Sequence, residues 1–280
     1  NANFAYMRTL LLFLFFWPFI IQAQSHDNWQ IEEGEDIFWE NSRSPLTNDV
    51  VVKTGGTLTI KSNVWFDEGA RLMFERGAHL VIDGGTLTSC ENLWQGIEVW
   101  GTYNQIQSQA YQGVVQLING GTIENASKAI RTIKVIEDET EGEILDYHYT
   151  GGMVQATNAY FINNRTDVIF FEYNISSISG FTDCNFIIND DYLETFNPGY
   201  FVRLNSMRGV NFVNCSFQNN SSTACIGSGI YAFNSGFTVR GKCTSQEEPC
   251  PAEDWDYGEF INLHRGIYAT SGGTVYYPEI

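Results

Sequence analysis

The sequence predicts an all-β chain folded as a right-handed parallel β-helix, and three features support this prediction. Short stretches carry apolar residues at every second position, as in Leu58 and Ile60 or Leu80 and Ile82. A period of two is that of β-strands with one buried face. The stretches recur at intervals of 22 to 37 residues and are bounded by Gly- or Asn-containing corners. Repeats of this length are typical of solenoids.

The N-terminal segment has the layout of a secretory signal peptide. Met7 and one positive charge precede an unbroken apolar run over residues 10–21. The run is shorter than the roughly 20 residues that a membrane-spanning helix needs, and it contains Pro18. We therefore expect export, with cleavage near Ala23 and no membrane span in the mature chain.

The chain divides into four expected segments. Ile37, Phe38 and Trp39 lie in mixed polar and aromatic sequence suited to cover the first coil. A last coil starts at Gly272 and stops at Ile280, so we expect a longer natural protein and self-association through an uncovered C-terminal end. The expected segments are an upstream extension (1–6), the signal peptide (7–24), an N-terminal cap (25–48) and a β-helix truncated at its C-terminus (49–280).

The coils are predicted from recurring strands. Leu58 and Leu80 are 22 residues apart, which fits one turn of several short strands. Phe161, Phe186 and Phe217 follow at intervals of 25 and 31 residues, each with an Asn after its strand. Asn tolerates the left-handed backbone of a tight corner, and its amide can bond to the Asn of the next coil. We expect the Phe side chains to stack in the interior, together with the reduced thiols of Cys184 and Cys215.

A polar loop is inserted between two copies of the sequence Gly-Ile-Tyr-Ala, at 229–232 and 266–269. Cys243 and Cys250 bracket this loop. We expect them to form a disulfide in an oxidising compartment. The cysteines lack the Cys-Xaa-Xaa-Cys spacing and nearby His of a zinc site, so none is expected.

Three motifs together carry a family resemblance. They are the Gly-Gly-Thr strands, the tract Cys-Glu-Asn-Leu-Trp-Gln-Gly-Ile-Glu-Val-Trp-Gly at 90–101, and the Phe-Xaa-Xaa-Cys-Xaa-Phe-Xaa-Xaa-Asn coils. Over residues 49–280 the chain resembles secreted right-handed parallel β-helix repeat proteins of Bacteroidota type, many of which use type IX secretion. The C-terminal sorting domain typical of that group is absent from these residues. The resemblance implies fold and export, but no single activity, because lyases, hydrolases, adhesins and spacers share this repeat.

The charge of the chain excludes some partners. The formal net charge is −18, while 43% of the residues are hydrophobic and 17% are charged. Such a field repels nucleic acid and anionic lipid. It suits a soluble extracellular protein, and we expect no cofactor, with calcium as the remaining possibility.

Two acidic segments are candidate sites, each with a simpler alternative. Asp190 and Asp191 resemble the paired aspartates of polygalacturonases, but the companion motifs of that group are missing, so a solvated corner is the favoured interpretation. The second hypothesis is a calcium site in the acidic run at 137–143. This run lacks the ligand spacing of a dedicated calcium loop, so a mobile, hydrated insertion is the favoured interpretation. The candidate calcium ligands are Glu137, Asp138, Glu139 and Glu141.

Aromatic residues are candidates for glycan contacts because sugar rings stack on Trp and Tyr. Trp94 and Trp100 belong to the tract at 90–101 and are expected to pack at a coil junction. The loop candidates for ligand binding are Trp255, Tyr257, Asp254 and Asp256.

The function predicted from these features is that of a secreted or cell-surface scaffold. It is adhesin-like, and its loops bind a surface polysaccharide or another protein. The alternative is a carbohydrate-active enzyme, a polysaccharide lyase or glycoside hydrolase, acting on the β-helix face near Asp190 and Asp191.

Overall fold

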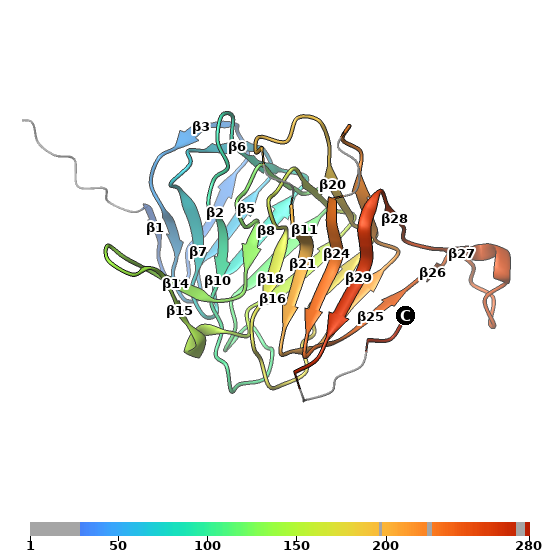
Figure 1. The fold of residues 1–280 in the computed structure, drawn as a ribbon. Helices are drawn as coiled ribbons and strands as arrows, with labels where there is room; N and C mark the ends of the chain where they lie inside the picture. The colour runs from blue at the N-terminus through green and yellow to red at the C-terminus, as the bar shows by residue number, and fades with distance from the viewer. Residues whose placement is uncertain (1–28, 196–197, 223–225, 273–277) are drawn as a thin grey trace, which may run out of the picture.

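The chain folds as a parallel β-helix in a computed structural model that describes residues 29–195, 198–222, 226–272 and 278–280 (Figure 1). The expected signal peptide and upstream extension lie outside these residues. Each coil contributes one strand to each of three parallel sheets, which we call A, B and C.

The strands of each sheet follow one another at intervals of one coil. Sheet A contains β1 (Trp29–Ile31), β4 (Val50–Val52), β7 (Arg71–Phe74), β10 (Gly96–Val99), β13 (Ile130–Arg131), β18 (Val168–Phe170), β21 (Tyr200–Asn205), β24 (Ile226–Phe233) and β29 (Leu263–Thr270). Sheet B contains β2 (Asp36–Trp39), β5 (Thr57–Ile60), β8 (His79–Asp83), β11 (Val114–Ile118), β16 (Met153–Thr157), β19 (Gly180–Thr182), β22 (Arg208–Val213) and β25 (Gly236–Arg240). Sheet C contains β3 (Arg43–Leu46), β6 (Asn63–Phe66), β9 (Thr86–Thr88), β12 (Thr122–Glu124), β17 (Tyr160–Ile162), β20 (Asn185–Ile188), β23 (Ser216–Asn219) and β28 (Phe260–Ile261).

Two insertions leave the stack of coils (Figure 1). The first is an antiparallel hairpin followed by a 3-10 helix: β14 (Lys134–Asp138), β15 (Gly142–Asp146) and η1 (Tyr147–Tyr149). The second is an arm near the C-terminal end of the stack: β26 (Lys242–Cys243), η2 (Ala252–Asp254) and β27 (Trp255–Asp256). Each 3-10 helix has three residues, and no helix among the described residues is long and apolar enough to cross a bilayer.

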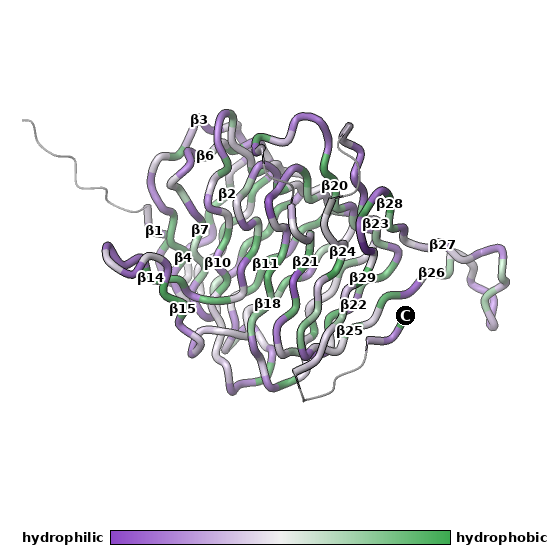
Figure 2. The backbone as a smooth tube through the Cα atoms, in the orientation of Figure 1, coloured by the Kyte–Doolittle hydropathy of each residue, from purple (hydrophilic) through white to green (hydrophobic). Residues whose placement is uncertain are grey.

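The interior is built from columns of equivalent side chains, and hydrophobic segments accordingly follow the strands in Figure 2. In sheet C, the predicted Phe stack is present: the Phe186 ring lies 4.9 Å from Phe161 and 4.5 Å from Phe217, with the planes nearly parallel. The thiols of Cys184 and Cys215 are free and buried beside it. Burial of a phenylalanine contributes about 1.5–3 kcal/mol, so this column stabilises the C-terminal coils.

Asparagine corners join the coils as predicted. Asn163 has a φ of 54° and Asn214 a φ of 50°, both in the left-handed region. The Asn163 side-chain amide donates to Asn189 Oδ1 at 2.7 Å, and that of Asn214 donates to Asp183 Oδ1 at 2.8 Å. Each corner residue therefore accommodates the turn and bonds to a neighbouring coil.

The structure differs from the expected cap over residues 25–48. In its described part, strands β1, β2 and β3 pair in parallel with β4, β5 and β6. Trp39 is in register with Ile60 and fully buried. Ile37 and Trp39 point inward and alternate with the exposed residues Asp36 and Phe38, as in later strands, so this segment extends the sheets as a first coil instead of covering them.

Candidate functional site

The outer face of sheet A carries a second column of aligned side chains, opposite to the buried one. Parallel pairing places these residues in register through successive coils. The column contains Met73, Glu98, Arg131, Ile169, Arg203, Tyr231 and Tyr268. Met73 to Ile169 are buried, whereas the last three residues are more exposed. The outer face is therefore covered over the earlier coils and open over the later ones.

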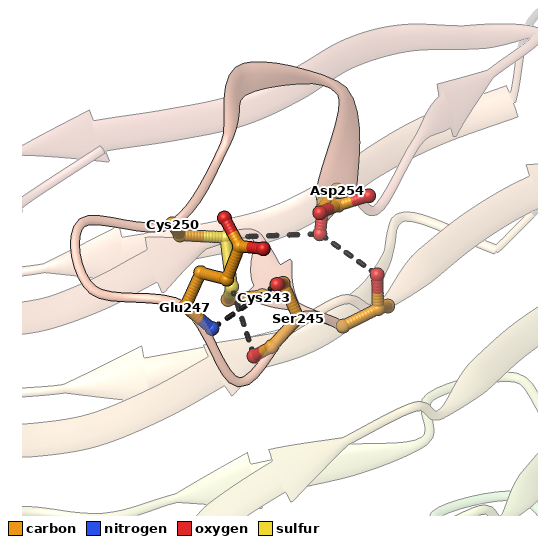
Figure 3. The surroundings of a disulfide bond; sticks show 6 residues. Cys243, Ser245, Glu247, Cys250 and Asp254 are labelled. Carbon is orange, nitrogen blue, oxygen red and sulfur yellow. Dashed lines mark hydrogen bonds between the residues drawn. A yellow bond between two sulfur atoms is a disulfide. The ribbon is translucent and has the colours of Figure 1, made fainter.

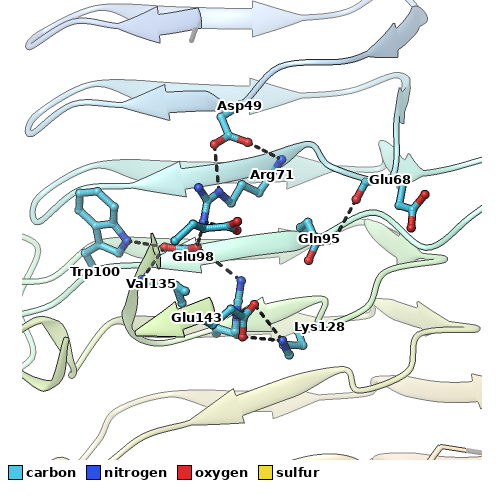
Figure 4. A network of polar contacts seen from close by, with 11 residues as sticks. Asp49, Glu68, Arg71, Gln95, Glu98, Trp100, Lys128, Val135 and Glu143 are labelled. Atoms are coloured by element: carbon cyan, nitrogen blue, oxygen red, sulfur yellow. Dashed lines mark hydrogen bonds and ion pairs between the residues drawn. The ribbon is translucent and has the colours of Figure 1, made fainter. Parts of the chain in front are cut away.

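Glu98 attaches the hairpin that covers the earlier coils (Figure 4). One oxygen of its buried carboxylate contacts Arg71 Nη1 at 3.1 Å and Arg131 Nη2 at 3.4 Å. The other accepts the indole N–H of Trp100 at 3.1 Å and the backbone N–H of Val135, in β14, at 3.0 Å. All four donors satisfy a carboxylate that would otherwise be costly to bury, so Glu98 has a structural role.

Glu143 attaches the second strand of the hairpin. Its carboxylate binds Lys128 Nζ at 2.9 Å and Arg131 Nη1 at 2.8 Å. Partial burial raises the pKa of Glu143, but the hydrogen bonds from Lys128 and Arg131 outweigh this effect and hold the pKa below its usual value. The acidic run at 137–143 is thus a solvent-exposed insertion, as expected from the sequence, and it forms a hairpin that ion pairs fix to sheet A.

A groove opens where the hairpin ends and the uncovered coils begin. This outer groove is lined by Leu145, Tyr147, Phe171, Tyr200, Arg203 and Phe233, among others, and has a volume of about 420 Å³. Tyr147 is 52% exposed and meets Phe171 edge to face at 6.3 Å. Aromatic walls with polar groups between them are typical of ligand sites.

Arg203 is held in a fixed position in the outer groove. Its Nε donates to Asn205 Oδ1 at 2.8 Å, and its Nη1 donates to the Tyr200 hydroxyl at 3.1 Å. The guanidinium lies over the rings of Tyr200 and Tyr231, at 5.7 and 5.8 Å from their centroids. No carboxylate of the described residues lies within ion-pair distance of it, in contrast to Arg131.

A smaller lobe continues the outer groove on the other side of Tyr147. It has a volume of about 250 Å³ and is lined by Tyr103, Tyr147, His148, Thr150, Glu172 and Asn174. Tyr147 and Glu172 line both lobes. The two cavities are therefore adjacent, with these two side chains as a shared wall.

Asp190 and Asp191 lie outside the outer groove. They occupy the corner after β20 in sheet C, where Asp190 Oδ1 accepts the backbone N–H of Ser222 at 2.6 Å and Asp191 is exposed. Backbone and side-chain hydrogen bonds from Ser222 lower the pKa of Asp190. Neither residue lines the outer groove or its smaller lobe.

The other candidates for ligand binding lie on the arm. The disulfide expected between Cys243 and Cys250 is present there (Figure 3). Trp255 and Tyr257 are exposed, and their rings are 6.2 Å apart and nearly parallel. The Asp254 backbone carbonyl accepts two hydrogen bonds from Thr244.

Asp256 pairs with Lys242 in the β26–β27 ladder, which forms part of the arm. None of the four candidates on the arm lines the outer groove.

The candidate calcium ligands take part in the hairpin. Glu137 lies 3.3 Å from Arg71 Nη1, and Asp138 Oδ1 accepts the backbone N–H groups of Thr140 and Glu141. These bonds lower the pKa of Asp138. Glu139 and Glu141 are exposed beside it. Within the described ranges, no three His, Cys, Asp or Glu side chains are grouped as a metal site.

Trp94 and Trp100 pack as expected from the sequence. Trp94 is fully buried and stacks on Phe66 at 4.3 Å. Trp100 is 9% exposed and packs edge to face on Tyr149 at 5.7 Å. Both residues support coil junctions and are not surface platforms for sugars.

The sequence analysis did not single out Arg203, Tyr200 or Tyr147. A signal was present, because Tyr231 and Tyr268 occupy the same position of the repeated Gly-Ile-Tyr-Ala element. Their rings lie 5.5 Å apart in the structure. The residue in register with Tyr231 one coil earlier is Arg203, and the Tyr200 ring stacks on Tyr231 at 5.7 Å, so following this column backward would have led to the groove.

The fold and the groove define a parallel β-helix protein with two adjacent, aromatic-lined cavities on the outer face of one sheet. Comparisons of the chain with protein-family models, curated proteins and solved structures found no match in any of the three. The geometry of the site therefore carries the functional argument.

Proposed function

We propose that this chain is a secreted or cell-surface scaffold that binds a glycan in the outer groove without cleaving it. The observation that carries the proposal is that two adjacent cavities share the exposed ring of Tyr147, so that an extended ligand lying across this ring would reach both. A sugar chain needs such a path, with aromatic faces for its C–H groups and polar side chains for its hydroxyls.

Export is supported by two independent features. The apolar run at 10–21 has the length of a signal peptide, and the Cys243–Cys250 disulfide suits an oxidising compartment. A surface polysaccharide is therefore a suitable ligand class, and the exposed Trp255–Tyr257 pair on the arm is a second surface for a glycan or protein partner.

Binding is favoured over catalysis by the state of the carboxylates. Glycoside hydrolysis needs a carboxylic acid that donates a proton and a second carboxylate nearby. The outer groove contains two carboxylates, Glu143 and Glu172, and Glu143 is held by Lys128 and Arg131, whose hydrogen bonds lower its pKa. Such a carboxylate is a poor proton donor at neutral pH.

The test combines a glycan array with assays for reducing ends and unsaturated uronides on the purified exported protein. We expect binding without product formation. Replacement of Tyr147 by Ala is expected to weaken binding about fivefold to tenfold, or about 1–1.4 kcal/mol. The matched control is Tyr111→Ala, which removes an equally exposed tyrosine outside both lobes.

Two outcomes would overturn this proposal. Product formation that is abolished by Glu172→Gln would identify the groove as a catalytic site and support the alternative of a lyase or hydrolase. Failure to bind any glycan, with equal behaviour of the Tyr147 and Tyr111 variants, would remove the outer groove as a glycan site.

A further inference from the structure

We propose that the outer groove selects acidic sugars, and that the guanidinium of Arg203 holds their carboxylate. This inference rests on the proposed glycan-binding function and adds the ligand class. It starts from a local reversal of charge. The chain carries a formal net charge of −18, yet the lining of the outer groove contains three cations, Lys128, Arg131 and Arg203, against two carboxylates.

The ion pairs of the groove leave Arg203 as the cation available for a ligand. Lys128 and Arg131 are both bound to Glu143, and Arg131 also contacts Glu98. Arg203 has no carboxylate within ion-pair distance in the described part of the chain. A guanidinium beside aromatic rings is only weakly hydrated, so an incoming anion displaces little tightly bound water.

The position of Arg203 is set before any ligand arrives. Asn205 accepts from its Nε, and the Asn205 amide is itself anchored on the Phe170 carbonyl at 3.0 Å. Tyr200 accepts from Nη1 at 3.1 Å. Nη2 makes no hydrogen bond within the described residues, and Nη1 carries a second hydrogen, so the guanidinium keeps donors on both nitrogens for a planar carboxylate. Little side-chain entropy is lost on binding, because the side chain is already ordered.

The smaller lobe explains why the ligand is a sugar chain with an acidic unit instead of a simple anion. It offers the hydroxyl of Tyr103 and the amide of Asn174, both exposed, with Glu172 as an acceptor at the junction. These groups suit the hydroxyls of a neutral ring. A carboxylate beside Arg203 and a neighbouring ring across Tyr147 would occupy both lobes at once.

One further cavity, formed by residues that the structure describes, lacks this combination of groups. This cavity of about 380 Å³ near Phe66 is lined by Asp67, Glu68 and Glu91 without a cation, and it would repel an acidic sugar. The outer groove differs because Arg203, the cation without a carboxylate partner in its described lining, lies over the rings of Tyr200 and Tyr231.

The test measures affinity for three oligosaccharides of equal length by titration calorimetry. They are a uronic-acid oligosaccharide, its carboxyl-reduced neutral form and a sulfated, anionic derivative of that neutral form. We expect the uronic-acid form to bind at least tenfold more tightly than the carboxyl-reduced form. Arg203→Ala should remove this difference while leaving affinity for the neutral form within about twofold, and Arg203→Lys should restore only part of it.

The matched control is Arg265→Ala. Arg265 lies over the Tyr268 ring at 4.1 Å in a following coil and does not line the groove, so its loss removes the same charge without removing the contact. We expect less than a twofold change for this variant. Circular dichroism would verify that each variant is folded.

The outcomes separate this inference from the proposed function. Equal binding of the acidic and neutral forms, or an equal effect of Arg203→Ala and Arg265→Ala, would overturn the assignment of Arg203 while the glycan-binding function stood. Tighter Arg203-dependent binding of the sulfated form would overturn the choice of a carboxylate. Failure of all three oligosaccharides, and of the glycan array, would reject the proposed function itself.

Discussion

Glu98 and Arg131 face each other in adjacent coils of sheet A and form an ion pair of 3.4 Å with side chains only 1% and 2% exposed. The pair lies under the β14–β15 hairpin, whose Val135 N–H also binds Glu98. Each charge stabilises the other, because either one alone would be buried without a compensating opposite charge and would destabilise the fold.

Replacing Glu98 by Gln should destabilise the protein strongly. Arg71 and Arg131 both lose a carboxylate partner, so we expect the free energy of unfolding to fall by about 3–5 kcal/mol. Denaturation in urea, followed by circular dichroism, measures this change. Glu75→Gln is the control, because the Lys53–Glu75 pair is partly exposed and should contribute about 0–1 kcal/mol. Equal effects of the two substitutions would contradict the role given to Glu98.

Asp167 makes the stability of the protein dependent on pH. Asp167 is 1% exposed and accepts one hydrogen bond from Asn164 at 2.8 Å. Burial raises the pKa of Asp167 well above its usual value, although the bond from Asn164 acts in the opposite direction. The folded protein therefore holds this proton more tightly than the unfolded chain. Its contribution to stability is complete below the unfolded pKa of about 4 and is lost as pH rises through the raised folded pKa.

The variant Asp167→Asn should remove this loss. Asn keeps the acceptor oxygen and carries no charge, so we expect its Tm to match that of the wild type near pH 4 and to exceed it increasingly toward pH 8. Each kcal/mol corresponds to about 2–4 °C in a protein of this size. Scanning calorimetry across this pH range is the measurement, with exposed Asp67→Asn as the control. A difference that shrinks as pH rises would show that the sign is wrong.

The double substitution Asp190→Asn and Asp191→Asn should leave ligand binding within about twofold of the wild type. Both residues lie at a corner of sheet C, and Asp190 caps the Ser222 N–H there. The affinity for oligosaccharides and any hydrolytic activity are the quantities to compare. A loss of more than about tenfold, or 1.4 kcal/mol, would favour the enzyme alternative with its site at this corner.

Loss of the Cys243–Cys250 disulfide should affect the arm and leave the stack of coils intact. In the described residues, β26 and β27 pair with each other and lie outside the three large sheets. We expect faster proteolysis at 242–257 after Cys243→Ser and Cys250→Ser, since a closed loop of this size contributes about 2–3 kcal/mol locally. The main Tm should change by less than about 2 °C.

Peptide mapping without reductant provides the matching chemical test for the cysteines. Cys243 and Cys250 should appear linked, and Cys184 and Cys215 should react with an alkylating reagent only after unfolding, because both thiols are buried. A linked Cys184–Cys215 pair would contradict the structure of the core.

Features that recur in every coil could be predicted from the sequence. The alternation of Leu58 and Ile60, the Phe161–Phe186–Phe217 column and the Asn corners each follow from local rules that repeat along the chain. The Cys243–Cys250 pair is also predictable from local sequence, because its members are only seven positions apart. The position of Asp190 and Asp191 shortly after a strand predicted an exposed corner, and the structure places them in one.

The first coil, the ordered hairpin and the outer groove needed the three-dimensional arrangement. The intervals between Ile169, Arg203, Tyr231 and Tyr268 are 34, 28 and 37 residues, so no constant period aligns these outward side chains. Backbone hydrogen bonds between coils set their register, and the loops absorb the differences in length. Whether an outward residue meets water, a hairpin or a ligand depends on what is inserted several coils away, and no local pattern in the chain records that contact.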